Sequence, residues 1–204
     1  MKIGAMYNHL NGYEWLQVHR KETWEEIEKV IASIDAEEYR TKKSKEKTMK
    51  DKMVFSPIDL NARMKKEFEA SGWKESRFNY YVTDDYELTA DIMHLPYEEQ
   101  KIRIEKAGKT AISSYNQTDF QKDRVAIEVQ LAKYSFIEFD LFVKHLGFYI
   151  GNTIDLGIEI IPTKKLQSEM SSGPGYFERV IHHIARQGRG TPAVPLILIG
   201  VEQD

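Results

Sequence analysis

A short segment in the C-terminal half alternates apolar and polar positions in the way typical of a β-strand with two different faces. Every odd-numbered residue from 125 to 131 is aliphatic, and these side chains would share one face because alternate strand residues point the same way. Glu128 and Gln130 would lie side by side on the opposite face, after Ala126. The pattern therefore predicts a central strand that displays an acid and an amide.

The segments after this strand alternate between helical and strand-like patterns. If residues 136–151 form a helix, apolar side chains would lie on nearly all of its sides, as in a buried helix, and Gly151 would end it. A strand is expected in 153–163, a helix in 176–187 and an apolar central strand in 193–202. Strands that alternate with helices predict an α/β core, with a central β-sheet flanked by helices.

The first half of the chain has mostly helical patterns. Helices are expected in 22–34, in 56–73 and in 97–115, and a β-prone aromatic segment lies between the last two. Ser56 and Pro57 form a good N-cap and first-turn pair for the second helix. We expect one domain over 1–204, with an N-terminal helical part of about 1–110 and a catalytic α/β core of about 111–204.

Composition narrows the class of protein. The chain has 204 residues and no cysteine, which excludes disulfides, thiolate zinc sites and thiol nucleophiles. No apolar run reaches the length of a membrane span, and the first residues lack the apolar core of a signal peptide. A cytoplasmic protein without a membrane partner is expected.

One segment is strongly basic although the formal net charge is only −3. Residues 40–52 hold seven Lys and Arg residues against Glu46 and Asp51. A solvated charged segment is the ordinary interpretation of such a run. Contact with nucleic-acid phosphates is the alternative, because it needs local rather than net positive charge. The sequence leaves both open.

Two acids near the predicted strand suggest a metal site. Asp119 precedes Glu128 by nine positions, and the residues between them can form a turn that returns Asp119 to the face of Glu128. Two converging carboxylates repel each other unless a cation joins them, and hard oxygen ligands favour Mg²⁺. The spacing alone is weak evidence, because charged residues make up 30% of the chain.

The residues around these acids carry a specific resemblance. The pattern consists of Asp119, Phe120, Lys122, Glu128, Val129, Gln130, Tyr134 and Phe136. It resembles the BglII/BstYI group of type II restriction endonucleases, within the PD-(D/E)xK nuclease superfamily. Similarity to the BstYI branch runs through nearly the whole chain, and includes "GWKESR", "SYNQTDF", "KDRVAIEVQ", "DLFVKH", "EMSSG" and "RQGRG". The resemblance implies a restriction-endonuclease-like core with a mixed central sheet and extra N-terminal helices.

The resemblance also implies roles for the site residues. Asp119 and Glu128 would be catalytic acids that bind Mg²⁺, together with the main-chain carbonyl of Val129. Gln130 would stand where the superfamily usually has lysine. Gln carries no charge and exchanges no proton near neutral pH, so Gln130 could only hold the attacking water in line.

A substrate and partners follow from the same resemblance. The group cuts duplex DNA at palindromes centred on GATC, and the BstYI branch cuts RGATCY after the first purine to leave four-base 5′ overhangs. Two equivalent cuts at a palindrome imply a homodimer. Lys133 and Ser172 would contact the DNA near the outer base pairs. A DNA methyltransferase would be a genetic companion only.

Other interpretations fit the same residues. A structure-selective or repair nuclease could share the metal core, and a DNA-binding protein could have lost catalysis. Lys133 and Ser172 could be an ordinary exposed lysine and a turn former, and the segment 186–190 could either contact phosphates or only link two elements. His145 is expected in the core. A further acid among Asp84, Asp85 and Glu87 could assist the reaction.

Overall fold

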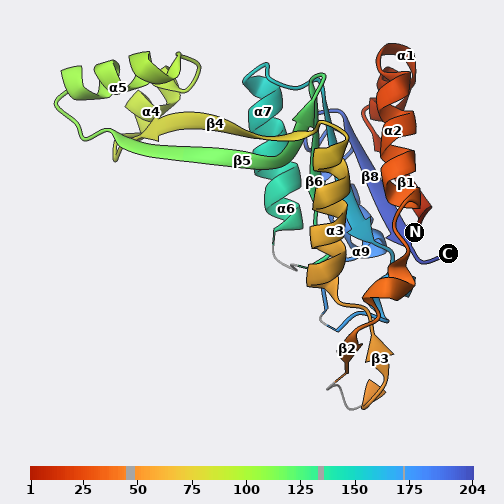
Figure 1. Cartoon of the computed structure of the whole chain (residues 1–204). Helices are drawn as coiled ribbons and strands as arrows, with labels where there is room; N and C mark the ends of the chain where they lie inside the picture. The colour runs from red at the N-terminus through yellow and green to blue at the C-terminus, as the bar shows by residue number, and fades with distance from the viewer. Residues whose placement is uncertain (45–48, 133–135, 172) are drawn as a thin grey trace.

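The computed structural model describes residues 1–44, 49–132, 136–171 and 173–204, and its centre is a six-stranded sheet (Figure 1). The order is β1-β8-β7-β6-β5-β4. The bounds are β1 Lys2–His9, β4 Lys74–Val82, β5 Ile112–Lys122, β6 Val125–Val129, β7 Leu156–Pro162 and β8 Leu196–Glu202. β6, β7 and β8 are parallel and the other pairs are antiparallel. The predicted α/β fold with a mixed central sheet is confirmed.

Helices cover both faces of the sheet. On one face α1 (Gly12–His19), α2 (Lys21–Ala32) and α3 (Pro57–Ala70) pack on the larger apolar core. On the other face lies a continuous helix made of α6 (Ile137–Phe139), the π-helical segment η3 (Asp140–His145) and α7 (Leu146–Ile150), next to α9 (Phe177–Gln187). Ser56 caps α3 as predicted, and its hydroxyl accepts from Asp59 N.

The strand β6 has the two faces that its sequence predicts. Val125, Ile127 and Val129 join the larger core, on the side of α1 to α3. Ala126 instead packs with Phe148 of α7 on the opposite side. Because Glu128 shares the face of Ala126, its side chain is directed toward the α6–α7 helix rather than into the larger core.

β4 and β5 continue beyond the sheet as a long arm, and α4 (Tyr86–Ile92) and α5 (Tyr97–Lys106) lie at its tip (Figure 1). The predicted helix 97–115 is therefore wrong beyond Lys106. Gly108 has a φ of +71°, a left-handed conformation that ends a helix at low cost. Residues 112–115 then pair with β4, and Asp119 lies within β5 rather than in a turn.

The N-terminal part contains an edge strand of the sheet, β1, that was not predicted from the sequence. β1 forms the sheet edge opposite β4 and pairs with β8, with Lys2 facing Glu202. Its side chains are mostly exposed or half-buried, so its apolar pattern is weaker than that of a central strand. The N-terminal part thus contributes an edge strand to the sheet besides its helices.

A small hairpin projects from the body beyond the start of α3 (Figure 1). It follows η1 (Ala36–Tyr39) and pairs β2 (Lys42–Lys43) with β3 (Met53–Val54). Phe55, which follows β3, accepts a hydrogen bond from Ser171 N and donates one to Glu169 O. Arg40, which precedes β2 and lies over the ring of Phe55, forms an ion pair with Glu169 at 2.9 Å. The hairpin is thereby fixed to the segment just after α8 (Lys164–Gln167).

None of the helices in the described part of the chain is long and apolar enough to cross a membrane.

Candidate active site

The hairpin between β5 and β6 brings Asp119 to the end of β6. The two strands pair from Lys122 opposite Val125 to Phe120 opposite Ile127. Asp123 and Arg124 form the turn with φ values of 49° and 65°, as in the tight turns that suit two-residue hairpin loops. Asp119 is half-buried, and its Oδ2 accepts a hydrogen bond from Val129 N at 3.2 Å. Asp119 thus lies beside the strand that carries Glu128.

Glu128 is fully buried, and neither of its carboxylate oxygens has a hydrogen-bond partner among the described residues. Its Oε1 lies 2.7 Å from Lys144 Nζ, in an ion pair without hydrogen-bond geometry, and its Oε2 has no hydrogen-bond partner among the described residues. Burial and the nearby Asp140 raise the pKa of Glu128 to about 8, although Lys144 acts in the opposite direction. A buried oxygen without a partner is available to a cation.

Asp140 and Lys144 are site residues that the sequence did not reveal. Both come from η3, one helical turn apart, and Lys144 Nζ is 2.7 Å from Asp140 Oδ1. Asp140 is fully buried, and its Oδ2 accepts from Gln130 Nε2 at 2.8 Å. The sequence nevertheless held an indication of this pair. Asp140 and Lys144 stand four positions apart in a largely apolar helical segment, and this spacing places them on the same side of a helix.

Glu159 adds another acid beside this group. It faces Glu128 in the parallel register of β6 and β7 and is fully buried. Burial and then Asp140 and Glu128 raise the pKa of Glu159 well above its ordinary value. His145 Nε2 lies 3.5 Å from Glu159 Oε2, and burial lowers the pKa of His145 to about 3. As predicted, His145 is a core residue.

Gly157 makes room for the ring of His145. A Cβ on Gly157 would lie 2.6 Å from ring atoms of His145, closer than van der Waals contact allows. The absence of a side chain on β7 thus lets His145 reach the sheet next to Glu159.

The donor set at the end of β6 fits a hard cation. Among the described residues, no group of three or more His, Asp, Glu or Cys side chains is arranged to hold a metal ion. The predicted site needs only two carboxylates, because a main-chain carbonyl completes it. Glu128 offers an oxygen without a protein partner, and Asp119 lies beside Val129. Carboxylate and carbonyl oxygens are the ligands that Mg²⁺ prefers.

The two predicted DNA contacts, Lys133 and Ser172, lie outside the described residues. Their neighbours are held in place on both sides of the site. Leu131 N, before the first, donates to Asn61 Oδ1 of α3 at 3.3 Å. Ser171 N, before the second, donates to Phe55 O at 3.0 Å.

The acids considered as possible assistants are elsewhere. Asp84 pairs with Lys109 at 3.4 Å, Asp85 caps α4 through Leu88 N, and Glu87 lies in the first turn of that helix. All belong to the arm, away from the end of β6 (Figure 1). The acids that the fold brings to Glu128 are Asp140 and Glu159.

His182, His183, Arg186 and Arg189 lie on and just after α9. His183 is hydrogen-bonded to Glu138 at 2.6 Å, and the rings of His182 and His183 lie 6.1 Å apart without stacking. Arg186, in the last turn of α9, and Arg189, in the segment that follows it, are exposed.

Comparison with known proteins identifies the family. Residues 5–201 match the family model described as "Restriction endonuclease BglII/BglIII". The search of curated proteins found no match. Among solved structures, the crystal structure of BglII complexed with a DNA 16-mer matches with a TM-score of 0.65 and 19% identity, over 100% of this chain and 79% of that chain. The crystal structure of free BglII matches with a TM-score of 0.57 and 17% identity, over 100% and 81%. With its family match spanning almost the whole sequence, the chain belongs to the BglII/BglIII family of restriction endonucleases and is a type II restriction enzyme that cuts DNA.

Proposed function

We propose that this restriction endonuclease belongs to the BstYI branch and cuts duplex DNA at RGATCY, after the first purine, leaving four-base 5′ overhangs. The proposal rests on the sequence motifs shared with that branch. The observation that carries its chemistry is the end of β6, where Asp119 lies beside Val129 and Glu128 presents an oxygen without a partner among the described residues.

Asp119, Glu128 and the carbonyl of Val129 would hold Mg²⁺. The bound ion would lower the pKa of a water molecule and stabilise the charge that develops on the phosphate. Gln130, half-buried after β6, would hydrogen-bond that water and hold it in line with the phosphorus. Its amide takes no proton near neutral pH, so its contribution is positioning.

A homodimer is part of the proposal. Two equivalent cuts in a palindrome need two sites related by a two-fold axis. Exposed apolar side chains on the α6–α7 helix, Phe139 at 43% and Val143 at 41% exposure, support a protein interface on the helix that also carries Asp140 and Lys144.

The function is tested with mapped plasmid DNA, Mg²⁺ and the purified protein. We expect discrete fragments whose ends map to RGATCY, from a species of twice the chain mass. Random nicking, or cutting governed by DNA structure, would instead indicate a structure-selective or repair nuclease. Specific binding without any cutting would indicate a DNA-binding protein that has lost catalysis.

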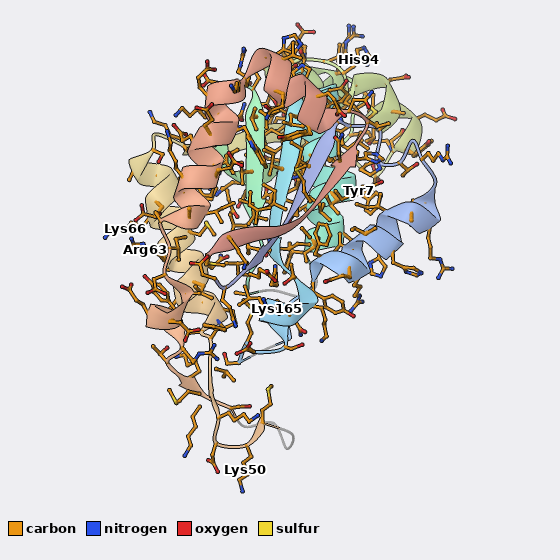
Figure 2. All side chains as sticks on the ribbon, turned by 90° about the vertical axis from the view of Figure 1, so that its right-hand side faces the viewer. Tyr7, Lys50, Arg63, Lys66, His94 and Lys165 are labelled. Carbon is orange, nitrogen blue, oxygen red and sulfur yellow. The ribbon has the colours of Figure 1, made fainter. Side chains whose placement is uncertain are left out.

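The β2–β3 hairpin is proposed as a contact with DNA phosphates, together with Lys133 and Ser172 at the outer base pairs. Lys42, Lys50 and Lys52 are exposed, and Lys50 projects from the body on this hairpin (Figure 2). Lys43 is instead paired with Asp51 at 2.9 Å. Phe55 and Arg40 fix the base of the hairpin to residues 169–171, just before Ser172.

Replacing Lys42, Lys50 and Lys52 by Gln should weaken DNA binding and reduce its dependence on salt. Each phosphate contact contributes about 0.9 to the slope of log affinity against log salt concentration, so the slope should fall by about 2 to 3. Fluorescence anisotropy with duplex DNA, without divalent metal, measures it. The triple variant of Lys2, Lys21 and Lys29 to Gln has the same charge change on β1 and α2, and serves as control. An equal loss of slope in both variants would show that only net charge matters.

The proposed function also implies a cellular location and a companion enzyme. Restriction acts on DNA in the cytoplasm, and a methyltransferase that modifies the same sequence would protect the host without touching this chain.

A further inference from the structure

The side-chain amide of Gln130 is held in one orientation. Its Nε2 donates to Asp140 Oδ2 at 2.8 Å. Burial raises the pKa of Asp140, whereas Lys144 and Gln130 favour its ionised form. Because an ionised carboxylate has acceptors only, that form takes the NH₂ group of Gln130 and not its carbonyl. The oxygen and nitrogen of a side-chain amide have nearly the same size, so their positions are assigned from their hydrogen-bond partners. Oε1 of Gln130 is thus directed away from Asp140.

Lys144 holds the carboxylate of Asp140, which in turn orients the amide of Gln130. Its ammonium lies 2.7 Å from Asp140 Oδ1 and 2.7 Å from Glu128 Oε1, and it donates to Gln117 O at 3.1 Å. An ammonium has three donors, and three protein oxygens surround this one. The charge of Lys144 is therefore already paired with two carboxylates.

The position of Asp140 suits a positioning role. Its side chain is fully buried, and it lies at the start of the π-helical segment η3. Short π-helical segments occur frequently at functional sites. Asp140 thus connects a helix on one face of the sheet to Gln130, the residue that follows the strand of Glu128.

We propose that Asp140, held by Lys144, is a positioning residue that makes Gln130 present its carbonyl oxygen to the attacking water. Gln130 Oε1 then accepts a hydrogen bond from one O–H of the water, which directs an oxygen lone pair toward the phosphorus. Gln130 takes no proton and forms no covalent bond. This inference rests on the proposed function, and it assigns an orientation that the sequence pattern alone does not give.

The first test is a double-mutant cycle on cleavage. Asp140→Asn is nearly isosteric, and it removes the requirement for the Gln130 NH₂ group to face it. We expect kcat to fall about 10- to 100-fold, the usual effect of losing a partner that orients a reacting group. KM and metal-free DNA binding should stay unchanged. In a Gln130→Ala background, Asp140→Asn should have no further effect, because Asp140 acts through Gln130.

Asp123→Asn is the matched control. It makes the same carboxylate-to-amide change at the exposed turn between β5 and β6, where the residue has a φ of 49° that Asn tolerates, and it should leave cleavage unchanged. If Asp140→Asn lowers kcat equally with and without Gln130, Asp140 has a structural role and the inference is overturned.

The second test needs no cleavage. In an NMR spectrum of the ¹⁵N-labelled wild-type protein, the side-chain NH₂ of Gln130, assigned with Gln130→Ala, should have one proton shifted downfield by its bond to a carboxylate. The shift should disappear in Asp140→Asn. A wild-type Gln130 signal typical of a solvated amide would overturn the inference. A wild-type protein with the shifted signal that does not cut RGATCY would instead overturn the proposed function alone.

Discussion

Replacing Glu128 by Gln is expected to reduce DNA cleavage by at least about 1000-fold. The change removes one of two carboxylates at the end of β6 while keeping the side-chain volume. Charge stabilisation of the phosphate by a bound Mg²⁺ contributes several kcal/mol to lowering the barrier, and a loss of about 4 kcal/mol corresponds to this factor. Asp119→Asn should have an effect of similar size, because both acids would hold the same ion.

Thermal stability separates chemistry from folding in both variants. Glu128 is fully buried and its raised pKa favours the protonated form, so Glu128→Gln, which resembles that form, should melt near the wild type at pH 7 and above it at higher pH. Asp119 is half-buried, and Asp119→Asn should melt near the wild type. Electrophoretic mobility shifts without divalent metal should show that both variants still bind cognate DNA. Cleavage at the wild-type rate by Asp119→Asn would refute the metal assignment.

Apparent affinity for divalent metal is expected to rise steeply with pH, about 50-fold between pH 6 and pH 8. The pKa of Glu128 is raised to about 8 in the metal-free protein, so below that pH a proton competes with the cation for the carboxylate. Each pH unit below the pKa then costs up to about tenfold in apparent affinity.

The titration of Glu128 should also make the free energy of unfolding decrease as pH rises. Glu128 has a folded pKa above its ordinary value of 4.5, so the folded protein binds more protons than the unfolded chain between about pH 4.5 and 8. Its contribution to stability is present at low pH and is lost as pH rises through this window. A cation should offset the loss.

Thermal unfolding with and without Ca²⁺ at pH 6, 7 and 8 measures both effects. The increase in melting temperature caused by Ca²⁺ should grow with pH in the wild type, and Glu128→Gln should show no such growth. A metal-induced increase that is equal at all three pH values would mean that Glu128 is already ionised at pH 6.

The strand that carries Glu128 could be predicted because its pattern is local. Alternation over seven residues fixed the faces of β6, and the hairpin turn between Lys122 and Val125 followed from the short spacing of Asp119 and Glu128. β1 was missed because an edge strand has few buried side chains. The end of α5 was missed because the pairing of β5 with β4, over residues 112–115, overrides a charged helical pattern.

The surroundings of the site could not be predicted in the same way. Glu159 reaches Glu128 only through the parallel register of β6 and β7. Asp140 and Lys144 reach it only because η3 packs on that face of the sheet. Neither the register nor the packing is encoded within a few residues, whereas the pattern of Asp119, Glu128 and Gln130 is. The electrostatics of Glu128 therefore required the three-dimensional structure.

The pairing of β1 with β8 has a consequence for the order in which the protein folds. Asp119, Glu128, Gln130, Asp140 and Lys144 all lie within one contiguous stretch of the chain, so their contacts have low sequence separation and close small loops. The pairing of β1 with β8 instead joins residues from opposite ends of the sequence, since Lys2 faces Glu202. Long-range strand pairing of this kind is slow. We therefore expect the catalytic centre to be assembled early, in a folding intermediate whose sheet still has an open edge at β8.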